Sequence, residues 1–306
     1  MNSTVLSGPR FDVYRAVTDK IVQAIEKGAG EFVMPWHRFG PSIGRPTNAV
    51  TGLQYRGVNI VALWGEATIT GYGSGHWASY KQWQNAGAQV RKGEAGSTIV
   101  FFRELEPGDE GEARGPGEEL PRRLIARASR VFNAEQVDGW KHLPPVTREP
   151  MVVLEKVDAL VTATGGTVRH EGQSAFYDRR DDVIMLPPRE RFTGTPTSSP
   201  LESYYATLLH ELTHWSGAAH RLDREFGRKF GDSAYAMEEL VADLGSAFLC
   251  ADLAVTCEPR PDHAAYLQLW LTLLKQDARV IFTTARLANR ASDYLHELAA
   301  ASNARS

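Results

Sequence analysis

The feature that most constrains this chain is the run His210-Glu211-Leu212-Thr213-His214, in which two histidines stand four positions apart. Residues at this spacing share one face of a helix, so both imidazoles can bind a single metal ion. Glu211 lies slightly off that face, where its carboxylate can take a proton from a water on the ion and pass it to a leaving group. The run therefore predicts a helix that carries two metal ligands and a general base.

The residues before this run also predict a helix. Ser199, Pro200 and Glu202 match a capping box with proline at the first helical position. Apolar residues at helical spacing then provide a face for the core, namely Leu201, Tyr204, Tyr205, Leu208 and Leu212.

A catalytic zinc ion needs a third protein ligand and one open position, and the sequence offers two main candidates. The first is Glu239, which shares one face of a second helical pattern with the small residues Ala242 and Ser246. Asp243, one turn further, is placed to accept a hydrogen bond from a ligating histidine. This spacing resembles that of thermolysin-like peptidases. Glu238 is a weaker candidate, because it lies one residue off that face.

The second candidate is His220, because residues 210–220 match the longer pattern HExxHxxGxxH, in which Gly217 ends the helix and turns the chain back. Sites of this longer type also have a methionine in a turn, whereas Met237 lies within a strong helical pattern. His220 stands beside Arg221, as a surface residue would. The sequence thus favours Glu239 over His220, with Zn²⁺ as the expected metal and Mn²⁺ as an alternative.

Other parts of the site are predicted less specifically. Residues 181–187, DDVIMLP, read as a strand that either binds the substrate backbone by strand addition or belongs to the core. A tyrosine commonly stabilises the oxyanion formed during hydrolysis. Four tyrosines lie close enough in sequence, namely Tyr177, Tyr204, Tyr205 and Tyr235, and the sequence does not choose among them.

Composition places the chain among globular proteins: of 306 residues, 42% are apolar and 23% are charged. We see neither a secretory signal nor about 18 uninterrupted apolar residues, so we expect a cytoplasmic protein with no membrane span. Cys250 and Cys257 lie in one apolar stretch without the spacing of ligands or of a disulfide framework, which predicts buried, reduced thiols.

The pattern of segments predicts an α+β chain of two domains. Residues 1–142 combine an opening helix, short helices and two strands, whereas residues 150–306 begin with a small sheet and become mainly helical. Between the two strands, residues 104–119 hold seven acidic residues and one arginine, which predicts a flexible acidic loop. The proline-rich residues 143–150 are the expected linker.

The front of the chain is basic and rich in aromatic residues. Residues 1–103 hold eleven Lys and Arg against six Asp and Glu, a net charge of +5, and residues 131–306 have a net charge of −6. Single-stranded DNA is bound by rings that stack on bases, at about 1 to 3 kcal/mol each, and by cations along the phosphates. We expect some of the rings to be core instead. The predicted DNA-binding residues are Trp36, Arg45, Asn48, Tyr55, Arg56, Asn59, Trp77, Lys81, Gln82, Trp83, Arg91 and Lys92.

Several longer motifs occur together in this chain. The first part contains PW at 35–36, TGLQYRGVNIVALW at 51–64, WASYKQW at 77–83, VRKGE at 90–94 and VFNAEQVDGW at 131–140. The second part contains YYATLLHELTHWSG at 204–217 and EELVADLGSAFL at 238–249. Together they cover nearly the whole chain, and it resembles the ArdC-type antirestriction proteins of conjugative plasmids and related mobile elements.

The resemblance implies an N-terminal single-stranded-DNA-binding domain, of a kind also found beside plasmid primases, and a C-terminal zincin-like metallopeptidase domain. It implies His210, His214 and Glu239 as metal ligands, Glu211 as the base, and protection of incoming DNA from host restriction; His220 is not part of the family pattern. One hypothesis is a zinc-dependent peptidase that acts on an unknown protein substrate at single-stranded DNA. The alternatives are a non-catalytic protein that masks the DNA and has a structural metal site, and an accessory to priming or mobilisation.

Overall fold

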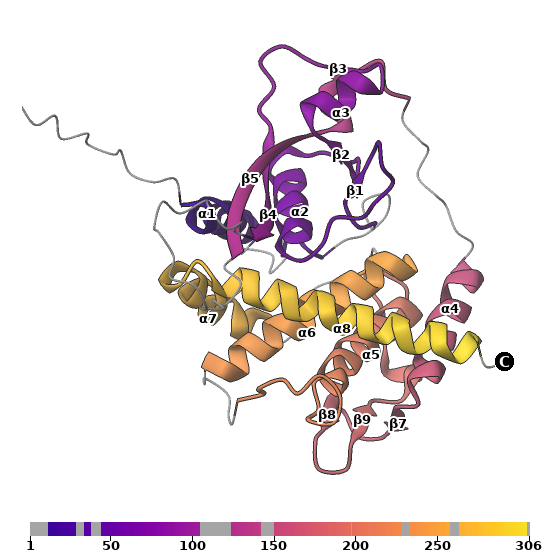
Figure 1. Ribbon diagram of the computed structural model, residues 1–306. Coiled ribbons are helices and arrows are strands. Elements are labelled where there is room, and N and C mark those ends of the chain that lie inside the picture. The colour runs from indigo at the N-terminus through magenta and orange to yellow at the C-terminus, as the bar shows by residue number, and fades with distance from the viewer. Residues whose placement is uncertain are drawn as a thin grey trace, which may run out of the picture.

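The computed structural model describes residues 12–28, 34–37, 44–104, 124–141, 150–196, 198–227, 233–257 and 263–304. It is an α+β protein, as the sequence predicted, with a first part of helices and short strands above a mainly helical second part (Figure 1). Most of the predicted acidic loop and of the predicted linker lie outside the described residues. No helix within the described ranges is both long and apolar enough to cross a lipid bilayer.

The first part is built around a twisted hairpin. The two predicted strands are β4 (Ser97–Glu104) and β5 (Leu124–Asn133), which pair antiparallel from Ser97↔Val131 to Glu104↔Leu124. They extend a four-stranded sheet of order β1-β2-β5-β4, in which β1 (Thr47–Asn48) and β2 (His76–Ala78) are parallel. The remaining elements are α1 (Val13–Gly28), α2 (Val58–Thr70), α3 (Tyr80–Asn85), β3 (Gln89–Val90), a 3₁₀ turn η3 (Ala134–Gln136) and β6 (Val137–Asp138).

The second part has a small sheet on one side of its helices. After α4 (Pro150–Thr164), the strands β7 (Thr167–His170), β8 (Phe176–Asp178) and β9 (Val183–Leu186) form a sheet of order β7-β9-β8. A 3₁₀ turn η4 (Arg189–Arg191) leads to the helices α5 (Pro200–Ser216), α6 (Ser233–Leu253), α7 (His263–Gln276) and α8 (Val280–Asn303). Met237 lies inside α6, so it does not form a methionine turn.

One hydrophobic cluster joins the two parts. It contains Ile21 and Trp64 from α1 and α2, and Phe248 and Trp270 from α6 and α7. The rings of Trp64 and Phe248 lie 5.8 Å apart, and α1 packs against α7 as well as α2. The domain boundary at the linker 143–150 stays a prediction, and the two parts meet through a shared apolar interior.

The cysteine prediction is confirmed. Cys250 and Cys257 are both buried and form no disulfide.

Candidate metal centre and active site

The metal-site helix α5 begins as predicted. The Ser199 hydroxyl accepts a hydrogen bond from the Glu202 backbone N–H, the Glu202 side chain accepts one from the Ser199 backbone N–H, and Pro200 is the first helical residue. Tyr204, Tyr205, Leu208 and other apolar residues of α5 are buried. The helix thereby turns the face of His210 and His214 toward α6, with the two ring centroids 4.9 Å apart.

Helix α6 approaches α5 closely because of a glycine. A Cβ atom at Gly245 would lie 2.6 Å from Cγ2 of Thr213, closer than real Cβ atoms come, so only glycine fits there without a shift. Near this contact the Ser246 hydroxyl donates a hydrogen bond of 3.0 Å to the backbone oxygen of Ala206. The close approach carries Glu239, on the same helix, to the two histidines of α5.

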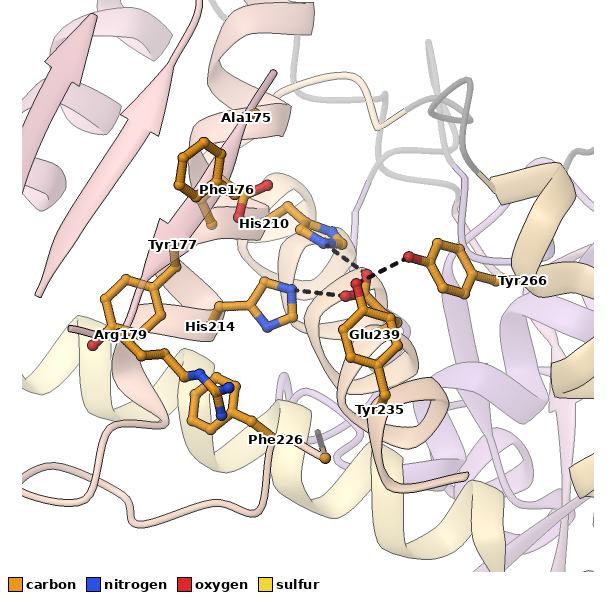
Figure 2. A pocket seen from close by; sticks show the side chains of 12 residues that line it. Ala175, Phe176, Tyr177, Arg179, His210, His214, Phe226, Tyr235, Glu239 and Tyr266 are labelled. Atoms are coloured by element: carbon orange, nitrogen blue, oxygen red, sulfur yellow. Dashed lines mark hydrogen bonds and ion pairs between the residues drawn. The ribbon is translucent and has the colours of Figure 1, made fainter. Parts of the chain in front are cut away.

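The three predicted ligands meet at this point. The Glu239 carboxylate oxygens lie 3.7 Å from Nε2 of His210 and 3.7 Å from Nε2 of His214 (Figure 2). One ligand atom from each of the three residues lies within 4.8 Å of the other two. Ligands about 2.1 Å from a tetrahedral ion are roughly 3.4 Å apart. The observed spacing therefore fits a divalent metal after a small adjustment of the side chains.

The carboxylate that orients His214 is Glu238. Nδ1 of His214 lies 3.1 Å from Oε1 of Glu238, which directs Nε2 toward Glu239. Burial opposes a charge on His214, but the hydrogen bond with Glu238 and the nearby carboxylates raise its pKa. Burial also favours a neutral Glu238, yet the hydrogen bonds from His214 and Arg224 lower its pKa. A histidine ligand typically donates its other N–H to a carboxylate in this way.

Arg224 completes this buried network. Its Nε and Nη2 atoms lie 3.0 and 2.7 Å from the two Glu238 oxygens, and it also donates to the Thr213 carbonyl and the Ser216 hydroxyl. The side chains of Arg224 and Glu238 are 3% and 4% exposed, so this is a fully desolvated ion pair. Sequence reasoning missed Arg224, since no motif marks it, and treated Glu238 only as a weaker ligand.

Two other residues that the sequence proposed for the site are His220 and Asp243. His220 does not join the metal group: its side chain is 64% exposed and its Nε2 lies 3.4 Å from Asp182. Asp243 is buried, accepts a hydrogen bond from the Trp36 indole N–H and lies 3.7 Å from Nε2 of His37. The predicted hydrogen bond from a ligating histidine to Asp243 stays a prediction, whereas Glu238 is the residue that orients His214.

A pocket of about 290 Å³ opens over the metal group. Glu211 lines it together with the three ligands, and aromatic residues from four segments form its other walls. Of the four tyrosines proposed for the oxyanion, Tyr177 and Tyr235 line the pocket. Tyr266, which sequence reasoning missed within the apolar pattern of α7, lines it too. Its hydroxyl lies 3.2 Å from that of Tyr235 (Figure 2).

The strand beside the pocket is β8 rather than the predicted residues 181–187. Those residues contain β9, which is paired on both sides, parallel with β7 and antiparallel with β8. Ala175, Phe176 and Tyr177 of the β8 segment line the pocket. In the described part of the chain β8 pairs only with β9, so its other edge can accept an extended peptide.

The three predicted DNA-stacking tryptophans are core residues. Trp36, Trp77 and Trp83 are 0%, 1% and 0% exposed. The prediction that they stack on bases is wrong, because a buried ring offers no face to a base. Arg45 is buried as well, where it donates to Asp252 and Ser292 and so joins the first part to α6 and α8.

Most of the polar residues that were predicted to bind DNA form hydrogen bonds or ion pairs within the protein. Asn59 exchanges two hydrogen bonds with the backbone of Val100, Arg56 pairs with Asp293, and Tyr55 donates to the Trp77 carbonyl. Burial raises the pKa of Tyr55 to about 12. Gln82 caps α3 and accepts a hydrogen bond from Asn48.

Arg56 is exposed beside Asp293 of α8, whereas the other exposed members of this predicted set lie on or beside α3 and β3, at the end of the first part that is away from the second part (Figure 1). Lys81 and Lys92 are exposed, and Arg91 is exposed but paired with Glu94 and Asp138. Arg91 and Lys92 border a hollow of about 560 Å³ that is also lined by Tyr80, a residue that is 47% exposed.

Two family models match the chain. Residues 11–132 match the N-terminal domain of the anti-restriction factor ArdC, and residues 155–287 match a zincin-like metallopeptidase. The chain is 42% identical to the uncharacterized protein y4eC of Sinorhizobium fredii (strain NBRC 101917 / NGR234), over 93% of this chain and 92% of that protein. It is 33% identical to a DNA primase TraC of Escherichia coli over 94% of this chain, but it spans only 20% of the primase.

Solved structures agree with these matches. The metal-free crystal structure of the antirestriction protein ArdC from plasmid R388 has a TM-score of 0.77 and 39% identity, covering 95% of this chain and 98% of that one. Its Mn(II)-bound structure has a TM-score of 0.74 and 38% identity, with 95% and 99% covered. Both parts of the chain and their arrangement are thus shared with that protein. The chain belongs to the ArdC family of antirestriction proteins.

Proposed function

We propose that this protein protects incoming DNA by binding single-stranded DNA and by hydrolysing peptide bonds at the metal centre. The observation that carries the enzymatic part is the convergence of His210, His214, Glu239 and Glu211 in one pocket beside the open edge of β8. The proposal places the protein in the cytoplasm, where incoming DNA meets restriction enzymes.

Each residue has a distinct role in the proposed hydrolysis. His210, His214 and Glu239 would hold a divalent ion, Zn²⁺ or Mn²⁺, which lowers the pKa of a bound water and polarises a carbonyl. Glu211 takes the proton of the attacking water and returns it to the leaving amine. We propose Tyr235 as the group that stabilises the oxyanion, because it lines the pocket and comes from α6, the helix that also carries Glu239.

The test of this role is Glu211→Gln, compared with Glu190→Gln on the exposed turn η4 as a matched control. Denatured casein and a proteome-derived peptide library, with Zn²⁺ or Mn²⁺ and with or without single-stranded DNA, serve as substrates. We expect cleavage by the wild type and by Glu190→Gln, and none by Glu211→Gln, although that variant still binds metal. The absence of any cleavage by metal-loaded wild type would refute the peptidase proposal.

For DNA we propose that the hollow at Tyr80 and Lys92 binds a single strand, with a base on Tyr80 and phosphates at Lys92 and at the exposed Lys81, which follows Tyr80 outside the hollow. The double variant Lys81→Glu/Lys92→Glu is compared with Lys156→Glu on α4 by the fluorescence anisotropy of a labelled oligothymidylate. Each lost phosphate contact reduces the slope of log affinity against log salt by about 0.7 for single strands. An unchanged affinity and slope would show that the strand binds elsewhere.

The match to TraC favours a second candidate, masking of DNA without catalysis. Nearly the whole chain, including the metal-site part, recurs within a protein named as a DNA primase. A DNA-transfer assay in a host with active restriction enzymes distinguishes protection by peptidase activity from protection by masking. Loss of protection with Glu211→Gln supports catalysis, and full protection by that variant supports masking.

A further inference from the structure

One arginine, Arg179, lines the pocket over the metal group and has no ion-pair partner among the residues that the structure describes. Arg179 follows β8 directly, is exposed and lines the pocket. Its neighbours Arg221 and Arg224 are paired with Asp182 and Glu238. Across the parts of the chain that the structure describes, no carboxylate lies within ion-pair distance of Arg179.

Arg179 is nevertheless held in place. Its guanidinium carbon lies 5.2 Å from the ring centroid of Phe226, a cation–π contact. Phe226 in turn lies 6.2 Å from the ring of His214. In Figure 2 Arg179 reaches toward Phe226 on the side of His214 away from Glu239. The ring of Phe226 is therefore in contact with both the Arg179 cation and the predicted metal ligand His214.

Stacking on Phe226 occupies one face of the guanidinium and leaves its edges to bind a ligand. Those edges carry N–H donors in a planar fork, which matches the two oxygens of a carboxylate. The carboxylates that also line the pocket, Glu211 and Glu239, belong to the metal group and have their own roles. The free edge of β8 ends one residue before Arg179, so a peptide paired with β8 would run past this cation.

We infer that Arg179 binds a carboxylate of the substrate, so that the site selects peptides with a negative charge close to the scissile bond. This inference rests on the proposed peptidase function. The carboxylate comes from an Asp or Glu side chain or from the C-terminus of the peptide. A phosphate of nucleic acid has the same charge, but the strand edge beside Arg179 offers backbone hydrogen bonds that suit a peptide.

The experiment uses a peptide that the wild type cleaves, taken from the library above. At each position near the cut it carries Glu, Gln or Lys in turn, and each version has a free or an amidated C-terminus. The proteins are the wild type, Arg179→Gln, Arg179→Glu and the control Arg180→Gln, whose side chain does not line the pocket. kcat/KM is measured for each combination of protein and peptide. Binding of the labelled peptides to Glu211→Gln, with and without Arg179→Gln, is measured by anisotropy, and thermal unfolding verifies the fold.

We expect the wild type and Arg180→Gln to prefer one negatively charged version by about tenfold or more, the size of a charge-assisted bidentate contact. Arg179→Gln should lose that preference in both kcat/KM and binding, and Arg179→Glu should favour Lys. A preference for the Glu versions would show that Arg179 binds a side-chain carboxylate. A preference for the free C-terminus would show that it binds the terminal carboxylate.

Two results would overturn the inference. One is equal cleavage and binding of all versions by the wild type, which leaves the peptidase proposal intact. The other is that oligothymidylate displaces the labelled peptide only from proteins that keep Arg179, while the charge of the peptide has no effect. That result would assign Arg179 to nucleic acid. Failure of the wild type to cleave any peptide refutes the proposed function instead. Arg179 is then tested by the anisotropy measurement alone, with labelled Glu, Gln and Lys versions of a library peptide that binds Glu211→Gln.

Discussion

Replacing Glu238 with glutamine tests whether the buried network prepares the metal site. The change keeps the shape of the side chain but removes its charge, and the Arg224 guanidinium is then buried without a counter-ion. Glu238 accepts hydrogen bonds of 2.7 and 3.0 Å from Arg224 and lies 3.1 Å from His214. Breaking a buried pair by removing one partner costs about 3 to 5 kcal/mol of stability.

The same variant should also lose metal affinity. A neutral amide oxygen accepts a weaker hydrogen bond from His214 than a carboxylate does, so Nε2 is held less firmly toward Glu239, and the loss of such a carboxylate partner typically weakens metal binding about 10- to 100-fold. The double variant Glu238→Gln/Arg224→Gln separates the two effects. It removes both charges, so it should regain part of the lost stability while its metal affinity stays low.

The assays are urea denaturation of the metal-free proteins and competition for Zn²⁺ with a chromophoric chelator. Exposed Glu190→Gln serves as the control, with stability and affinity close to those of the wild type. Metal affinity within twofold of the wild type in a folded Glu238→Gln protein would refute the reasoning. In that case Glu238 would only balance the charge of Arg224.

Two further predictions concern the elements around the site. Gly245→Ala places a Cβ 2.6 Å from Thr213 and should lower the free energy of unfolding by about 1 to 3 kcal/mol in urea denaturation, with weaker metal binding as Glu239 moves away. Adding Thr213→Ala to this variant should restore much of the stability and of the metal affinity. No loss of stability in Gly245→Ala would contradict the close packing of α5 and α6. Asp182→Asn tests the bond to Arg221, which with Tyr177 holds the pocket wall and lowers the pKa of Asp182 to about 2. This carboxylate is ionised in the folded state above that value, so its contribution is complete above the ordinary pKa near 4 and is lost as pH falls toward 2. Because Asp182 is 40% exposed, the variant should lose only about 1 kcal/mol at pH 7; the difference from the wild type should shrink below pH 4, and a difference that grows there would contradict the assignment.

Local sequence signals predicted those parts of the site that lie within one element. The capping box at Ser199 and the spacing of His210 and His214 depend on neighbours three or four residues away, and the structure has both. The two strands that form the hairpin of β4 and β5 were predicted for the same reason, since each strand has its own pattern.

Contacts between segments that are far apart in the chain could not be predicted from the sequence. Trp36 and Arg45 look like DNA-binding residues in a basic segment, but they are buried against Asp243, Asp252 and Ser292, about 200 or more positions away. Composition cannot distinguish an aromatic ring that stacks on a base from one that packs against a helix. The role of β8 likewise depends on strand order, because β9 lies between β7 and β8.

The most direct test of the whole account is a crystal structure of the protein soaked with Mn²⁺ or Zn²⁺, with the ion located by anomalous diffraction. We predict one peak bound by Nε2 of His210, Nε2 of His214 and a carboxylate oxygen of Glu239, with a further position open to the pocket beside Glu211. A peak held by His220, or no peak at the three ligands at a saturating metal concentration, would contradict it.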